Sequence, residues 1–175
     1  MKIALITNSR IPSLTANSIQ AMKVAQALMQ LGHDARMFAP AETEPVSQQL
    51  LITHYGVRLI PPLELLPSIS GLKRLDFIVH AQRAAQKFGA ELIYTWLPQS
   101  AALALWMKYP VVLEMHADVT GLMGAWWLRQ FWNAKGKKTM TVTTSALRNV
   151  LERSTKLKLE NEAVIVAPNG VELER

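Results

Sequence analysis

The sequence predicts an α/β fold in which a doubly wound parallel sheet of about seven strands carries helices on both faces. Its 175 residues are enough for one domain with a core, and half of them are hydrophobic. Short continuous apolar runs such as residues 2–7 are typical of strands that are covered on both faces. These runs alternate with helical patterns along the chain, which is the order expected of a parallel sheet.

Each element follows from a local pattern. The first helix has clear end signals, because Asn17 can serve as its N-cap with Gln20 at capping-box spacing, and Gly32 follows Leu31 as a stop. The apolar runs predict strands at 2–7, 35–39, 57–60, 92–96, 111–115, 138–143 and 163–167. The remaining helices are predicted at 45–55, 70–88, 99–108, 122–134 and 145–154. We therefore expect a Rossmann-like domain.

Composition excludes several classes of protein. There is no cysteine, so neither a disulfide framework nor a thiolate zinc site is possible, and no His/Asp/Glu cluster has metal-ligand spacing. Residues 1–10 resemble a strand rather than a secretory signal, and no apolar run reaches the ~18 residues of a membrane-spanning helix.

The net charge of +6 is concentrated in one segment. Residues 129–158 contain eight basic residues and one acidic residue. Such a segment attracts phosphate-bearing partners, namely anionic lipid, a phosphorylated substrate or nucleic acid. No recognised nucleic-acid motif accompanies it, so no nucleic-acid partner is expected.

The loop after the first predicted strand, residues 8–18, contains no glycine. A dinucleotide-binding Rossmann domain needs G-x-G-x-x-G there so that the backbone can approach a pyrophosphate, which argues against NAD or FAD binding through that motif. The loop has several hydroxyl and amide groups and leads into a helix N-terminus, which favours an anion. Two interpretations stay open: a polar ligand loop near a phosphate, and a solvated connection.

In an open parallel sheet, ligands bind beyond the carboxyl ends of the strands. His116 follows the predicted strand 111–115, where it could act as a general base or donate to a phosphate oxygen. Asp118 is close enough in sequence to orient His116 or to meet a hydroxyl. The alternative is a strand-end histidine that contacts only backbone. The other segments expected at this edge are 8–17, 96–99, 144–145 and 169–170.

Four aromatic residues in the segment 126–132 precede Lys135, Lys137 and Lys138. On a helix these rings cover well over half of the circumference, more than one sheet-packing face requires. Aromatic rings beside a basic cluster suit a membrane interface, so residues 126–138 could contact an anionic membrane. The alternative is that the rings pack on the sheet or on another domain.

Several segments together resemble one family. Residues 21–34, which close with Leu31-Gly32-His33-Asp34, resemble its first strand–helix unit, and 111–116 resemble its fifth strand with an active-site histidine. Residues 142–148 resemble its serine-then-helix unit, and 164–172, with Pro168-Asn169-Gly170-Val171, resemble the segment that ends the first domain. The chain thus resembles the N-terminal domain of retaining glycosyltransferases of GT-B fold, of the family 4 or group 1 type. A Gly-Gly pair that many members carry is replaced here by 16–18.

This resemblance implies an acceptor-side domain at 1–167 and the start of an interdomain linker at 168–175, with the C-terminal nucleotide-sugar domain absent from the chain. It implies transfer of a hexose from a nucleotide-diphosphate sugar to a hydroxyl of a glycolipid, lipid-linked or polysaccharide acceptor, without metal or cofactor. His116 would be catalytic. The residues expected to bind substrate are Arg10, Asn17, Ser18, Trp96, Asp118, Ser145 and Asn169.

The isolated chain is expected to be inactive, because half a cleft cannot stabilise the leaving phosphate. The chain would then be a piece of a longer protein or the product of a split gene. We expect a cytoplasmic location, with peripheral attachment to the inner face of the membrane if residues 126–138 bind lipid. The alternative function is a non-catalytic Rossmann-like module that docks on a separate partner chain.

Overall fold

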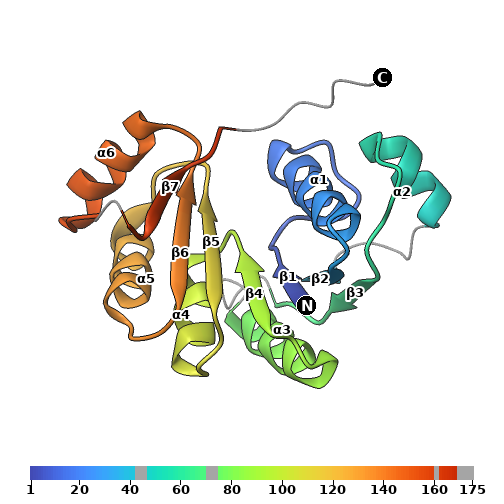
Figure 1. Cartoon of the computed structure of the whole chain (residues 1–175), viewed down its shortest axis with the longest axis horizontal. Coiled ribbons are helices and arrows are strands. Elements are labelled where there is room, and N and C mark those ends of the chain that lie inside the picture. The colour runs from blue at the N-terminus through green and yellow to red at the C-terminus, as the bar shows by residue number, and fades with distance from the viewer. Residues whose placement is uncertain (42–46, 70–74, 160–161, 169–175) are drawn as a thin grey trace.

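The computed structural model describes residues 1–41, 47–69, 75–159 and 162–168 and shows a seven-stranded, all-parallel sheet (Figure 1). The strand order is β3-β2-β1-β4-β5-β6-β7. The strands are β1 (Lys2–Ile6), β2 (Asp34–Pro40), β3 (Leu63–Leu66), β4 (Leu92–Thr95), β5 (Val111–Met115), β6 (Lys138–Val142) and β7 (Val164–Val166). The doubly wound parallel sheet predicted from the sequence is confirmed.

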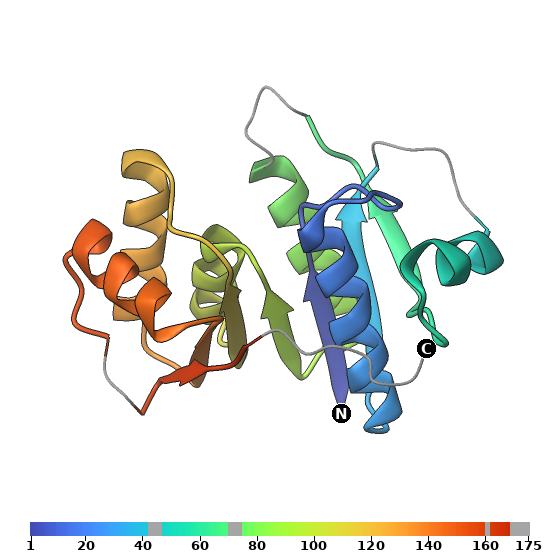
Figure 2. The same ribbon diagram turned by 90° about the horizontal axis from the view of Figure 1, so that it is seen from above.

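Within the described residues, six helices cover the two faces of the sheet (Figures 1 and 2). They are α1 (Ala16–Gln30), α2 (Gln48–Tyr55), α3 (Leu75–Phe88), α4 (Pro98–Trp106), α5 (Gly121–Asn133) and α6 (Ser145–Thr155). Buried residues of α1 and α2 form one core with β1 and β2, whereas those of α3 to α6 form the core on the opposite face. The change of side follows from the strand order, because the chain reverses direction across the sheet after β3.

Helix α1 begins earlier than its sequence pattern predicts. Thr15 is the N-cap, and its side-chain oxygen accepts a hydrogen bond from the Ser18 amide at 3.4 Å. Asn17, the predicted cap, lies inside the first turn of the helix and is exposed. The prediction was wrong because both residues are good caps and the sequence pattern does not distinguish them.

The third strand is also displaced from its predicted position. Residues 57–60 form no strand, because the amides of Arg58 and Leu59 approach Oε1 of Gln26 on α1, at 2.5 and 3.3 Å. The strand forms instead at Leu63–Leu66, directly after the two prolines, where it pairs with β2. The backbone of residues 58–59 thus bonds to a helix side chain rather than joining the sheet.

Helix α5 accommodates most of the aromatic segment by packing. Phe131 is fully buried, and Trp127 and Trp132 pack against the same core, whereas Trp126 is 40% exposed. The packing interpretation is therefore confirmed for three of the four rings, and membrane contact by the exposed Trp126 stays a prediction. None of the helices in the described ranges is long and apolar enough to cross a bilayer.

Candidate functional site

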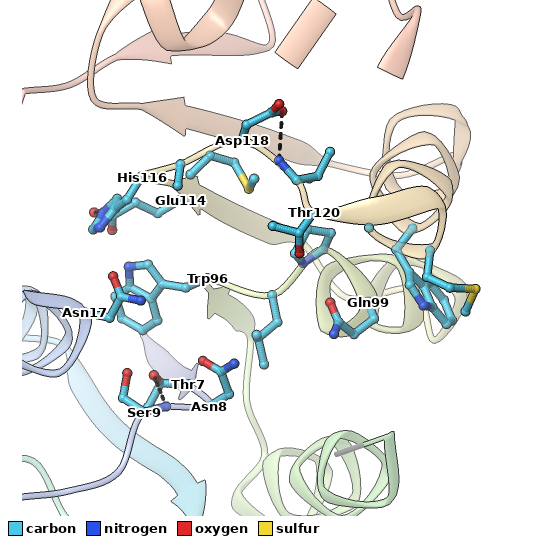
Figure 3. A pocket seen from close by; sticks show the side chains of 18 of the residues that line it. Thr7, Asn8, Ser9, Asn17, Trp96, Gln99, Glu114, His116, Asp118 and Thr120 are labelled. Carbon is cyan, nitrogen blue, oxygen red and sulfur yellow. Dashed lines mark hydrogen bonds and ion pairs between the residues drawn. The ribbon is translucent and has the colours of Figure 1, made fainter. Parts of the chain in front are cut away.

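A cavity of about 520 Å³ opens at the carboxyl edge of the sheet, where β1, β4 and β5 end (Figure 3). The strand order reverses between β1 and β4, which makes this the topological switch point at which open α/β sheets bind ligands. Residues 7–9, 96–99 and 114–120 supply most of the lining, with Asn17 from α1 and Met123, Gly124 and Trp127 from α5.

The loop after β1 presents polar groups on a fixed backbone. The Ser9 amide donates to Thr7 Oγ1 at 3.2 Å, and both residues are nearly buried, whereas Asn8 is exposed. Ile11 is 1% exposed and anchors the loop in the core beneath α1. The glycine-free loop is therefore held by packing, and it brings Asn8 and Asn17 to the cavity.

A buried carboxylate lies beside the predicted catalytic histidine. Glu114 Oε1 contacts Nε2 of His116, and Glu114 Oε2 accepts a hydrogen bond from the Tyr94 hydroxyl. Gln20 of α1 completes the cluster, with its Nε2 at 3.4 Å from Glu114 Oε1. Three side chains, from α1, from β4 and from the residue after β5, thus converge on one carboxylate.

The strand register explains this meeting. Tyr94 pairs with Val112 in the β4–β5 ladder. Side chains alternate along a strand, so residues 112, 114 and 116 share the sheet face of Tyr94. This is the face covered by α1, from which Gln20 reaches the carboxylate. A glutamate two residues before His116 was the sequence signal for this pair, and our sequence argument considered only Asp118.

The contacts perturb the acidity of two groups in the cluster. Burial raises the pKa of Glu114, but the hydrogen bonds from His116 and Tyr94 and the charge of His116 outweigh it, so its pKa lies below the ordinary value. The pKa of Tyr94 is raised, first by burial and then by the adjacent Glu114 charge and hydrogen bond. The cluster therefore contains an ionised glutamate and a neutral tyrosine at neutral pH.

Trp96 forms part of the cavity wall after β4. Its ring packs against Tyr94 with the centroids 5.2 Å apart. Its indole Nε1 is buried and has no hydrogen-bond partner among the described residues. An indole beside exposed amide groups offers a flat apolar surface and polar contacts side by side.

Asp118 lines the cavity but does not contact His116. Its Oδ1 accepts hydrogen bonds from the Val119 amide at 2.8 Å and from the Ser154 hydroxyl of α6 at 2.7 Å. Figure 3 shows its carboxylate pointing away from His116. Asp118 therefore ties the β5–α5 loop to α6. We had expected Asp118 to orient His116, but the residue that contacts His116 is Glu114.

Three other predicted site residues lie off the cavity. Ser18 is fully buried, and its hydroxyl donates to the carbonyl oxygens of Ser13 at 2.6 Å and Thr15 at 3.0 Å. Arg10 and Ser145 are exposed at the same edge of the sheet but do not line the cavity. Asn169 and the predicted linker beyond Pro168 lie outside the described residues.

A shallow apolar groove of about 310 Å³ adjoins the cavity on α5. It is lined by Leu122, Met123, Trp126 and Arg129, and Met123 also belongs to the cavity wall. Leu122 is 88% exposed and Met123 53%. In the described ranges, no group of three or more His, Asp or Glu side chains could hold a metal ion.

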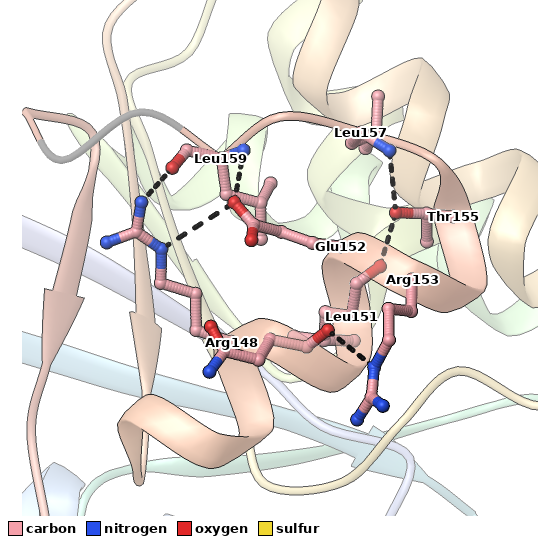
Figure 4. A network of polar contacts seen from close by, with 8 residues as sticks. Arg148, Leu151, Glu152, Arg153, Thr155, Leu157 and Leu159 are labelled. Atoms are coloured by element: carbon pink, nitrogen blue, oxygen red, sulfur yellow. Dashed lines mark hydrogen bonds and ion pairs between the residues drawn. The ribbon is translucent and has the colours of Figure 1, made fainter.

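Several cations of the basic segment contact backbone carbonyls. Lys138 Nζ lies against the last carbonyls of α5, and Arg129 reaches the Thr155 carbonyl at 3.4 Å. Arg148 contacts the Leu159 carbonyl and lies 3.9 Å from Glu152 (Figure 4). Part of the positive charge of this segment therefore binds backbone carbonyls at or after the ends of α5 and α6.

Comparisons with known structures support the fold. HepE from Anabaena, solved in complex with UDP and glucose, has a TM-score of 0.66 at 16% identity, over 98% of this chain and 45% of its own. Sucrose-phosphate synthase from Thermosynechococcus elongatus has a TM-score of 0.67 at 17% identity, over 99% and 49%. UDP-GlcNAc 2-epimerase from Methanocaldococcus jannaschii has a TM-score of 0.64 at 13% identity, over 95% and 46%.

These similarities show the fold alone, and one of the three proteins is an epimerase. The chain spans less than half the length of each of these structures, so it corresponds to one half of the GT-B architecture. No curated protein matches the sequence. The family model described as Glycosyltransferase Family 4 matches residues 18–175, nearly the whole chain. Together with the sheet order and the cavity at its switch point, this match shows that the chain belongs to Glycosyltransferase Family 4.

Proposed function

We propose that this domain binds the acceptor for an enzyme that transfers a hexose from a nucleotide-diphosphate sugar to an acceptor hydroxyl. The observation that carries the proposal is the cavity at the switch point, which His116, Asn17 and Trp96 line together. In the transfer, the acceptor oxygen bonds to the anomeric carbon, the bond from that carbon to the phosphate oxygen breaks, and the hydroxyl proton leaves with the nucleoside diphosphate. His116 lies beside the reacting groups and binds a hydroxyl through its imidazole.

The acceptor wall follows from what the cavity exposes. The Trp96 indole offers a stacking surface, and the amides of Asn8, Asn17 and Gln99 offer both donors and acceptors to sugar hydroxyls. The acceptor is a glycolipid, a lipid-linked sugar or a polysaccharide. We expect Arg10 and Ser145, which are exposed at the same edge of the sheet, to contact acceptor or donor when the cleft is complete, and we expect the same role for Asn169.

The donor is held mainly by a second domain that these residues do not supply. We infer this from the lengths of HepE and sucrose-phosphate synthase, because this chain matches only 45% and 49% of those proteins. The chain alone therefore transfers no sugar. Catalysis requires a closed site in which fixed dipoles stabilise the leaving phosphate, and one wall of a cleft provides few of them.

Ligand binding by the 175-residue chain tests the proposal. Saturation-transfer NMR with glucose, alkyl glycosides and polysaccharide fragments should detect binding, and His116→Ala should weaken it about tenfold, the equivalent of one hydrogen bond. The matched control is His80→Ala, an exposed histidine on α3, which should bind like the wild type. Absence of binding by any of these sugars, or equal binding by both variants, would refute the acceptor role.

Turnover is the second readout. Release of nucleoside diphosphate from UDP-glucose or GDP-mannose, with the same acceptors present, should stay at the rate without protein. Measurable transfer by the chain alone would show that the domain is a complete enzyme. Binding of a protein partner with no sugar binding would favour the non-catalytic docking module instead.

The groove on α5 supports a second role, peripheral contact with an anionic membrane on the cytoplasmic side. Leu122 and Trp126 are exposed beside Arg129, and Lys135 and Lys137 at the far end of α5 are exposed as well. An apolar surface on a helix that is followed by exposed cations suits the headgroup region of a bilayer. Lys138 is excluded from this contact because it is bound to the carbonyls of α5.

Co-sedimentation with vesicles tests this contact. The chain should sediment with phosphatidylcholine–phosphatidylglycerol vesicles more than with pure phosphatidylcholine, and Leu122→Ser should reduce sedimentation severalfold. The control is Leu31→Ser, since Leu31 is 72% exposed at the end of α1, on the other face of the sheet. Equal sedimentation with both lipids, or none, would remove the membrane role.

A further inference from the structure

We propose that Glu114 is a positioning residue that fixes His116 as its Nε2–H tautomer, so that Nδ1 is the ring nitrogen that accepts a hydrogen bond from a substrate hydroxyl. The first half of this proposal concerns the protein alone. The second half rests on the proposed function, since it names the group that the imidazole meets.

The argument starts from the chemistry of the carboxylate. An ionised carboxylate only accepts hydrogen bonds, whereas each nitrogen of a neutral imidazole is either a donor or an acceptor. Glu114 Oε1 contacts Nε2 of His116, so Nε2 must carry the proton. The other nitrogen, Nδ1, then has a free lone pair, and it has no hydrogen-bond partner among the described residues.

The ionised state of Glu114 is supported by its surroundings. Its side chain is only 9% exposed, yet Tyr94 donates to the second carboxylate oxygen and Gln20 lies 3.4 Å from the first. A buried charge of this kind persists when donors surround it. Tyr94 and Gln20 also hold the carboxylate in place, since they come from a different strand and from a helix.

The placement of His116 completes the argument. Its side chain is 17% exposed and lines the cavity, so it is neither sealed in the core nor free in solvent. Glu114 lies two residues before His116 and therefore on the same face of the sheet, so its carboxylate holds the imidazole ring in one orientation. A fixed tautomer matters because a ring with the proton on Nδ1 would present a donor where the hydroxyl needs an acceptor.

Nitrogen-15 NMR of the 175-residue chain measures the tautomer directly. Long-range proton–nitrogen correlations at about pH 8, above the ordinary histidine pKa, distinguish protonated from unprotonated ring nitrogens. We expect the His116 pattern to be fully Nε2–H. In Glu114→Gln the amide can donate as well as accept, so we expect a mixture of both tautomers. Tyr94→Phe, which keeps the carboxylate, should retain the wild-type pattern.

An Nδ1–H pattern in the wild type would overturn the proposal, as would an unchanged pattern in a folded Glu114→Gln. If Glu114→Gln does not fold, Glu114→Asp replaces it, and the shorter side chain should also lose the Nε2–H preference. Titration with the sugar found to bind should shift Nδ1 more than Nε2. A fixed Nε2–H tautomer without any such shift would count against the acceptor site and leave the positioning role of Glu114 standing.

Discussion

Replacing Lys138 with methionine removes the cation that caps the carboxyl end of α5. The Lys138 ammonium lies 2.6 Å from the Ala134 carbonyl and 3.4 Å from that of Phe131, and it also contacts the Trp132 carbonyl. These are terminal helix carbonyls that have no partner within the helix. Methionine keeps the apolar stem beside the rings of Phe131 and Trp132 but donates no hydrogen bond.

The magnitude follows from three contributions. Hydrogen bonds from a charged group contribute about 1.5–3 kcal/mol. A cation near a helix C-terminus adds about 0.3–1 kcal/mol. Burial opposes both, and it lowers the pKa of Lys138 by disfavouring the charged form. We therefore expect Lys138→Met to lower the free energy of unfolding by about 2 kcal/mol, which corresponds to a decrease in Tm of about 4–8 °C for a chain of this size.

Urea unfolding followed by far-UV circular dichroism measures this loss. The matched control is Lys137→Met, because Lys137 is adjacent and exposed and has no contact with the α5 carbonyls in the described structure. The control should change stability by less than about 0.5 kcal/mol. A loss below about 0.5 kcal/mol for Lys138→Met, or equal losses for the two variants, would refute the capping argument. Equal losses of stability would also mean that Lys138 is not held by the carbonyls and is available for membrane contact.

Three further predictions concern the core and the buried cluster. Burial raises the pKa of Glu114, but its contacts with His116 and Tyr94 lower this pKa on balance. The ionised group therefore stabilises the fold at pH values above the ordinary glutamate pKa, and this stability is lost as the pH falls through the lower pKa of the folded state. The wild type should accordingly lose more stability on acidification below about pH 5 than Glu114→Gln does, and parallel acid unfolding curves would contradict this sign. Tyr94→Phe should cost about 1.5–3 kcal/mol in urea unfolding at neutral pH, because it removes a donor from a buried carboxylate, and a cost near zero would show that water replaces the hydroxyl. Leu128→Ala should cost about 2–5 kcal/mol, since this fully buried side chain packs α5 on the sheet, and a smaller loss in thermal unfolding would mean that the core collapses around the gap.

The site could be located from the sequence but not assembled from it. The position of His116 at a strand end placed it on the carboxyl edge, and the structure brings it to a cavity with Asn17 and Trp96. Its partner was misjudged, because Asp118 and Glu114 are equally near in sequence. Strand pleating decides between them, since Glu114 shares the face of His116 whereas the loop turns Asp118 toward Ser154 of α6.

The sequence by itself determined the order of strands and helices, because each is encoded by a short apolar pattern, and it determined the edge at which polar loops gather. Only the tertiary structure decided which loop groups face a ligand. Ser18 is sealed by contacts within its own loop, and Gln20 reaches Glu114 across 94 positions of sequence. Such choices depend on how α1 packs on the sheet, and that packing is the joint result of many distant side chains rather than of any local pattern.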